Sequence, residues 1–159
     1  LVGWEDHKLV SAGFIWLKPG HPLIDQLRST AFDEYPVPGW FPGWQRSYLK
    51  ARKFLGIPKH VSDLEWGVIG PNLLTWLLGQ HGMLPGAQPV SWSCGLPWDE
   101  RRQIWAGSYD WKQWINGDTV CVHLWNHGLT QEERFRIPEA GSLLQTVAER
   151  AGFRWPEAP

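Results

Sequence analysis

The chain places histidine, asparagine and tryptophan side chains together in residues 119–128, with the sequence TVCVHLWNHG. The neutral imidazole of His123 offers a nitrogen to a metal ion or a phosphate, and the amide of Asn126 both donates and accepts hydrogen bonds. The apolar residues 120–122 just before them predict a buried strand. Because α/β proteins bind ligands beyond the C-terminal ends of such strands, we predict that this segment forms part of a binding site.

Two carboxylates, Glu5 and Asp6, stand next to each other near the start of the sequence. Carboxylates accept hydrogen bonds from sugar hydroxyls and stabilise a developing positive charge. A solvated turn is the ordinary alternative for such a pair. The run of small residues at 11–13, Ser-Ala-Gly, follows soon after and permits close approach of a ligand or of another backbone segment.

A third candidate is Gly70 followed by Pro71, a pair that predicts a tight helix start. The N–H groups of a first helical turn suit an anion, and a helix start without a ligand is the alternative. A lone histidine such as His123 has an equivalent alternative as a structural residue. The sequence contains no HExxH, Walker, CxxC or nucleophile-elbow motif, which excludes several common enzyme classes in their familiar forms.

The elements that would position these residues are predicted from apolar periodicity and turn signals. Residues 1–18 predict two strands around a charged turn at 5–8. Prolines and glycines exclude regular structure from 33–44, where aromatic side chains are expected to anchor the loop to the core. Helices are predicted at 22–32, 44–55, 72–80, 99–106 and 138–152, and a short strand at 88–91.

Length and composition favour a single domain over residues 1–159, because one domain usually holds roughly 100–200 residues. A hydrophobic share of 43% supports a core, while a net charge of −1 and a pI of about 6.6 give no basic footprint for nucleic acid. No apolar run reaches the ~20 residues of a membrane span. Cys94 and Cys121 lack metal-binding spacing and predict reduced thiols. We therefore expect a cytoplasmic protein, with peripheral contact to the inner face of the membrane left open.

Tryptophan is unusually abundant, with 13 residues in the chain. Carbohydrate sites use such rings, because the C–H faces of sugars stack on flat aromatics. The alternative is that the rings fill the core of a small domain, and we expect this of most of them.

Four segments, taken in order, resemble motifs of bacterial glycosyltransferase family 32 and its relatives, which include α-1,4-galactosyl- and α-1,4-N-acetylglucosaminyltransferases. The resemblance covers most of the chain, about residues 1–128, and the order of the motifs is stronger evidence than any one of them. The segments are Gly3-Trp4-Glu5-Asp6, Ser11-Ala12-Gly13-Phe14-Ile15, Gly70-Pro71-Asn72-Leu73-Leu74-Thr75 and Val122-His123-Leu124-Trp125-Asn126.

This resemblance implies an α/β fold, the C-terminal part of a Rossmann-like GT-A domain, and transfer from a nucleotide-sugar donor to a saccharide or glycolipid acceptor with retention. It implies Mn²⁺ or Mg²⁺ on the donor pyrophosphate, with His123 beside the metal. Asp6 and Glu5 would be catalytic, facing the donor sugar or the acceptor hydroxyl. The implied substrate-binding residues are Trp4, Ser11, Ala12, Gly13, Gly70, Pro71, Thr75, Trp125 and Asn126.

The sequence departs from the family pattern because these 159 residues include neither a DXD motif nor the donor-binding βαβ units. Ser11 also stands where relatives often carry asparagine. We therefore expect a fragment whose DXD-bearing half lies outside these 159 residues and which is inactive alone.

Two other functions fit the same sequence. One is a non-catalytic, tryptophan-rich glycan-binding module, which predicts exposed aromatic rings on one face of a sheet. The second is an inactive truncated homologue that binds no ligand. The rings expected to bind glycan in the first case are Trp40, Trp44, Trp111 and Trp114.

Overall fold

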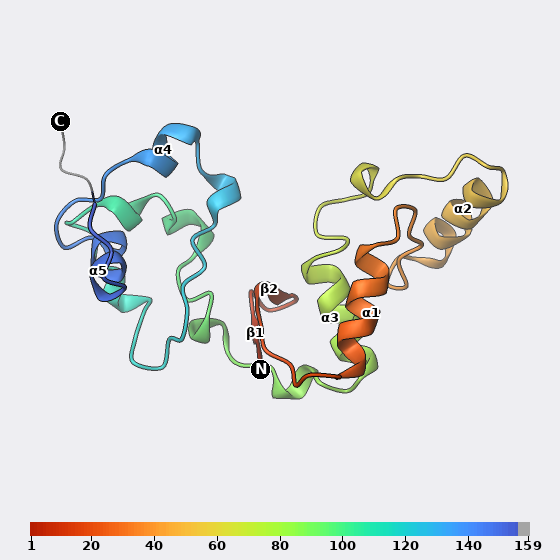
Figure 1. Ribbon diagram of the computed structural model, residues 1–159, viewed down its shortest axis with the longest axis horizontal. Helices are drawn as coiled ribbons and strands as arrows, with labels where there is room; N and C mark the ends of the chain where they lie inside the picture. Colours follow the sequence, from red (N-terminus) through yellow and green to blue (C-terminus); the bar gives the residue numbers. More distant parts are fainter. Residues whose placement is uncertain (156–159) are drawn as a thin grey trace. The chain divides into compact units, whose positions relative to one another are not determined.

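The computed structural model describes residues 1–155, apart from the side chain of His127. Their contacts form two compact units, residues 1–89 and residues 90–155 (Figure 1). Each unit has an apolar core of its own. The structure contains helices and a two-stranded sheet, which are described below. They do not test the assignment to a GT-A fold, which stays a prediction.

The first unit opens with an antiparallel hairpin of β1 (Val2–Trp4) and β2 (Val10–Ile15). The charged residues 5–8 form the turn between the strands, as the sequence predicts. Cα partners in the hairpin are Val2 with Ile15 and Trp4 with Val10, and the register shifts between these pairs. The strand predicted at 88–91 does not form: Gln88 makes an isolated parallel bridge with Gly3, and Val90–Trp92 is a 3₁₀ turn.

Three helices complete this unit: α1 (Pro22–Ala31), α2 (Gly43–Phe54) and α3 (Pro71–Gln80). The predictions of helices at 22–32, 44–55 and 72–80 are confirmed to within one residue. Proline stands at the first helical position of α1 and α3, where its missing N–H has no helical partner to lose.

The core of the first unit is built on α3, which packs against β2 and α1. Its leucines are spaced so that one face of the helix is continuously apolar. Phe41 is buried and Trp40 is half-buried, so these two rings anchor the irregular loop before α2 as expected, whereas the third ring expected to do so, Trp44, is 70% exposed. The core residues are Val2, Val10, Leu23, Leu73, Leu74, Leu77 and Leu78.

Helix α2 makes a much smaller contact with the rest of its unit. Leu49 is its one buried residue, and it packs in a small cluster with Phe41 and Val68. The face shared by Tyr48 and Leu55 points to solvent instead. The periodicity of apolar residues identifies one face of a helix, but it does not show whether the rest of the protein covers that face.

The second unit consists mainly of loops and single 3₁₀ turns, with two short helices, α4 (Gln131–Phe135) and α5 (Leu143–Arg150). The helix predicted at 138–152 is therefore shorter than expected. The helix predicted at 99–106 is two 3₁₀ turns, Trp98–Glu100 and Gln103–Trp105.

The prediction of a buried strand at 120–122 is wrong. Val120 is 58% exposed, and the segment has no ladder of strand pairs. It makes single backbone hydrogen bonds instead, from the Val120 N–H to the Trp92 carbonyl and from the His123 N–H to the Ser93 carbonyl. A short apolar run becomes a strand only where a neighbouring segment supplies a regular row of partners.

The core of the second unit is dominated by residues from these loops. The buried core residues are Cys94, Leu96, Ile104, Trp105, Trp125, Leu129 and Leu143.

None of the helices in the described part of the chain combines the length and apolar character needed to cross a membrane.

Candidate functional site

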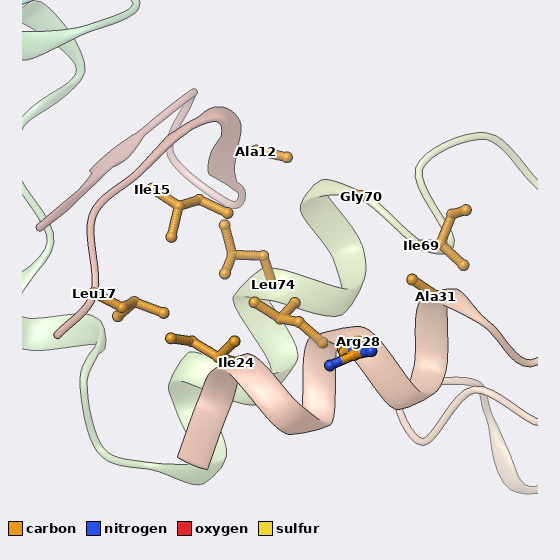
Figure 2. A pocket seen from close by; sticks show the side chains of 10 residues that line it. Ala12, Ile15, Leu17, Ile24, Arg28, Ala31, Ile69, Gly70 and Leu74 are labelled. Atoms are coloured by element: carbon orange, nitrogen blue, oxygen red, sulfur yellow. The ribbon is translucent and has the colours of Figure 1, made fainter. Parts of the chain in front are cut away.

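A pocket of about 570 Å³ opens between β2, α1 and α3 in the first unit (Figure 2). Figure 2 shows the side chains of Ile15, Leu17, Ile24 and Leu74 gathered around it. Leu74 belongs to the buried core, whereas Ile15 and Ile24 are each more than a third exposed. The lining residues are Ala12, Ile15, Leu17, Ile24, Leu27, Arg28, Ala31, Ile69, Gly70 and Leu74.

The pocket brings together two residues that the sequence nominates for substrate binding, Ala12 and Gly70. A third, Thr75, holds their elements in place. Its Oγ1 accepts a hydrogen bond from the Val10 N–H at 2.8 Å and donates one to the Pro71 carbonyl at 2.7 Å. Thr75 therefore attaches β2 to the first turn of α3 beside the pocket.

The chemistry of the pocket is apolar with one cation. Arg28 is the single charged side chain among the described residues that line it. Its guanidinium carbon lies 6.0 Å from the centre of the Phe32 ring, a cation–π contact at the edge of the usual range. An apolar lining with one permanent positive charge suits a ligand that has an apolar body and an anionic or strongly polar group.

Asp6 has a structural task in the hairpin turn. Its Oδ1 accepts hydrogen bonds from the N–H groups of Lys8 and Leu9, both at 2.7 Å. Desolvation raises the pKa of Asp6, but these hydrogen bonds and the nearby positive charges outweigh it, so the pKa lies below its ordinary value. Asp6 is exposed and does not line the pocket.

Glu5 has the opposite electrostatic environment, because desolvation and then the charge of Asp6 raise its pKa. Glu5 does not line the pocket either. Of the two adjacent carboxylates, Glu5 is the one whose pKa moves towards the range useful for proton transfer.

The remaining candidates of the first unit also have local structural roles. Trp4 is half-buried against the core. Ser11 is 2% exposed, and its Oγ accepts a hydrogen bond from the Gly13 N–H at 3.2 Å. At the start of α3 the Asn72 N–H donates to the Gly67 carbonyl at 3.2 Å, so this first-turn N–H is already satisfied. That arrangement favours a helix start without a bound anion.

In the second unit, the candidate Trp125 has a strained backbone conformation, and the candidates His123 and Asn126 are close to it in sequence. Trp125 has a φ of 51°, the only left-handed value for a non-glycine residue in the described chain. Its indole Nε1–H donates to the Leu96 carbonyl at 2.9 Å, and its ring centre lies 4.2 Å from that of His123. The packing of a buried indole holds this conformation in place.

The residues present do not fit the divalent metal that the resemblance implies. Among the described residues, no group of three or more histidine, cysteine, aspartate or glutamate side chains could hold a metal ion. The ring of His123 lies against the indole of Trp125. No chemical step is therefore assigned to a metal in this part of the chain.

The sequence did not nominate Ile24, Arg28 or Ile69 for a site. Ile24, Arg28 and Ala31 follow the spacing of one helix face, and this signal was present in the sequence. Ile69 had no such signal, because its place in the pocket depends on the turn that precedes α3.

The glycan-binding alternative predicts aromatic rings together on a sheet face, and the structure corrects this expectation. None of its four tryptophans belongs to β1 or β2, the two described strands. Trp40 packs against Trp76, with ring centres 5.8 Å apart, and Trp111 donates its Nε1–H to the Gly141 carbonyl. Nine of the thirteen tryptophans are buried or half-buried, which confirms that most of them serve the core.

No protein-family model matches this chain, and neither a curated protein nor a solved structure matches it.

Proposed function

We propose that this chain takes part in glycosyl transfer from a nucleotide-sugar donor to a glycolipid acceptor, and that the pocket of the first unit receives the apolar part of that acceptor. The resemblance of four ordered segments to family 32 glycosyltransferases supports the reaction class. The lining of the pocket supports the choice of acceptor.

The observation that carries the proposal is that two of the segments that resemble family 32 glycosyltransferases line the same pocket. Ala12 comes from the Ser-Ala-Gly segment and Gly70 from the Gly-Pro segment, and both line the same space. The hydrogen bond from the Val10 N–H to Thr75 Oγ1 joins the same two segments. Segments far apart in sequence that converge on one pocket are a common origin of binding sites.

A glycolipid fits this pocket better than a wholly polar saccharide. A sugar ring alone would place hydroxyl groups against Ile15, Leu17 and Ile24, where the described lining offers them few hydrogen-bond partners. Burial of a hydrocarbon chain there lowers the free energy of binding by about 25 cal/mol per Å² of apolar surface removed from water. Arg28 then faces the polar end of the acceptor, where a phosphate or a sugar oxygen accepts its hydrogen bonds.

In the proposed reaction, the bond between the anomeric carbon and the donor phosphate oxygen breaks. A new bond to the acceptor hydroxyl oxygen forms with the same anomeric configuration, and the nucleoside diphosphate leaves. In this proposal the acceptor hydroxyl gives its proton to Glu5, because Glu5 is the one of the two predicted catalytic carboxylates whose pKa is raised. The hydrogen bonds that Asp6 accepts stabilise the turn in which Glu5 lies.

Ligand-observed NMR on the 159-residue chain tests the pocket. Octyl glucoside below its micelle concentration is expected to bind, methyl glucoside to bind far more weakly, and octanol to bind less well than octyl glucoside. Ala12→Phe fills the pocket and is expected to weaken octyl glucoside binding at least tenfold. Ala151→Phe, at an exposed position after α5, is the matched control.

Equal binding by the Ala12→Phe variant would show that the pocket is not the site. Equal binding of octanol and octyl glucoside would show general apolar binding without sugar recognition. The reaction itself is measured by the appearance of a hexose mass increment on octyl glycosides supplied with a panel of nucleotide sugars.

A further inference from the structure

The outer face of α2 exposes an unusual amount of aromatic and aliphatic surface. Trp44, Tyr48 and Leu55 follow helical spacing along one face and are 70%, 51% and 68% exposed. Phe54 at the end of the helix is 90% exposed, and Ile57 just beyond it is 55% exposed. In Figure 1, α2 lies at the edge of the first unit, away from β1 and β2.

The same helix is strongly basic. Its sequence, GWQRSYLKARKF, carries Arg46, Lys50, Arg52 and Lys53 and contains no acidic residue. The Lys53 ammonium lies 3.9 Å from the carboxylate of Asp33, and both side chains are substantially exposed. The whole chain has a net charge of −1, so this positive charge is a local feature.

Two of the four cations lie beside the apolar face. At about 100° per residue, Arg52 is next to Tyr48 on one side and Lys50 is next to Phe54 on the other, whereas Arg46 and Lys53 lie on the opposite face of the helix. Arg52 is held in position, because its guanidinium donates to the Tyr48 hydroxyl at 3.1 Å and to the Ile57 carbonyl at 3.0 Å. The aromatic and cationic groups therefore form one arranged surface.

We propose that α2 binds the surface of an anionic lipid bilayer, with Trp44, Tyr48 and Phe54 entering the interface, Lys50 and Arg52 contacting lipid phosphates beside them, and the other two cations adding to the positive potential of the helix. Amphipathic helices with aromatic residues on one face and lysine or arginine beside them bind membranes in this way. Trp and Tyr favour the interface because each ring has an apolar body and a polar edge.

Charge complementarity selects this occupant over a second copy of the chain. A second α2 would bring four more cations and no carboxylates against the first four. A bilayer rich in anionic lipid supplies negative phosphates and a hydrocarbon layer together. This inference concerns a different surface from the pocket and does not depend on the proposed glycosyl transfer.

Co-sedimentation of the 159-residue chain with vesicles tests the inference. The chain is expected to bind vesicles of phosphatidylcholine mixed with phosphatidylglycerol, to bind phosphatidylcholine alone at least tenfold more weakly, and to be released by added salt. Two double variants, Trp44→Ser with Phe54→Ser and Arg46→Glu with Lys50→Glu, are each expected to lower the binding at least tenfold.

Matched controls use the same changes at exposed positions outside α2. These are Phe32→Ser with Phe135→Ser, at side chains 77% and 78% exposed, and Arg150→Glu with Arg154→Glu. Far-UV circular dichroism is required to show that every variant keeps its helices. All four substituted side chains of the α2 variants are exposed, so folding is expected to persist.

Three results would overturn the proposal. One is equal binding to neutral and anionic vesicles, and another is an equal loss of binding in the control variants. The third is absence of vesicle binding together with concentration-dependent dimerisation in light scattering that Trp44→Ser with Phe54→Ser abolishes, since this would assign the face to self-association.

Discussion

At the scale of single residues, the adjacent carboxylates Glu5 and Asp6 show how one turn separates two similar side chains. Asp6 accepts two backbone hydrogen bonds that favour its charged form, whereas desolvation and the charge of Asp6 disfavour the charged form of Glu5. The sequence presents them as a pair, and the hydrogen bonds of the turn distinguish them.

The Asp6 hydrogen bonds lead to a prediction about stability and pH. Asp6→Ala removes both bonds and is expected to lower the free energy of unfolding by about 1 kcal/mol, measured by urea unfolding. Asp6→Asn keeps an acceptor oxygen and should cost less.

Because the folded pKa of Asp6 lies below its ordinary value of 3.8, its ionisation contributes stability above that pH. This contribution is lost as the pH falls through the folded pKa. The difference between wild type and Asp6→Asn should therefore shrink in acid, and a difference that grew there would contradict the assignment.

Trp125 carries a second prediction at this scale. Trp125→Phe removes the donor to the Leu96 carbonyl and leaves a small void, because both residues are buried. We expect a loss of about 2 kcal/mol in the free energy of unfolding. Trp44→Phe, at a ring 70% exposed, is the control and should change stability by less than about 0.5 kcal/mol. Equal effects of the two variants would show that the Trp125 indole hydrogen bond contributes little.

At the scale of elements, Thr75 joins β2 to α3. Thr75→Val keeps the side-chain shape but leaves the N–H of Val10, a fully buried residue, without its acceptor. The expected loss is about 1–3 kcal/mol. Thr75→Ser keeps the hydroxyl and is expected to retain most of the stability. Amide hydrogen exchange at Val10 gives a direct check, since it should accelerate in the valine variant and stay slow in the serine variant.

The second unit depends on close backbone contacts instead of a sheet, and Gly95 tests this. A Cβ added at Gly95 would lie 2.4 Å from the Trp114 carbonyl oxygen, whereas one at Gly117 would meet nothing within 4 Å. Gly95→Ala is therefore expected to destabilise the unit by more than 1 kcal/mol, on the order of an overpacked core site. Gly117→Ala should be neutral or slightly stabilising. Thermal unfolding followed by circular dichroism compares them, and a neutral Gly95→Ala would show that the loops yield easily.

The elements that sequence reasoning predicted well are those with local signals. Proline at the first helical position fixes the starts of α1 and α3 wherever those helices pack. The strand expected at 120–122 failed because strand formation depends on a partner elsewhere in the chain. Periodicity predicts the helix α2 but does not show that the face of Tyr48 and Leu55 lies in solvent.

The candidate site was predictable to a similar extent. Ala12 and Gly70 were nominated by resemblance, and the structure places both in one pocket. Arg28 was missed because a lone arginine on a helix is ordinarily a solvated residue. Its significance comes from the apolar side chains that tertiary packing brings around it.

At the scale of the whole molecule, a nearly balanced charge coexists with a large exposed apolar surface. The chain has fifteen lysines and arginines and sixteen aspartates and glutamates, and its pI is about 6.6. Net charge near zero removes the repulsion that keeps molecules apart, and exposed rings such as Phe54 and Trp44 supply attraction between them.

We therefore expect solubility to pass through a minimum near the pI and to rise on both sides of it. Static light scattering across this pH range measures the attraction between molecules directly. Trp44→Ser with Phe54→Ser should raise solubility at the minimum without moving its pH, because the substitution removes apolar surface and no charge. Arg46→Glu with Lys50→Glu should instead move the minimum to lower pH, since it makes the net charge more negative. A minimum that both variants leave unchanged would show that the surface of α2 does not govern association of the chain.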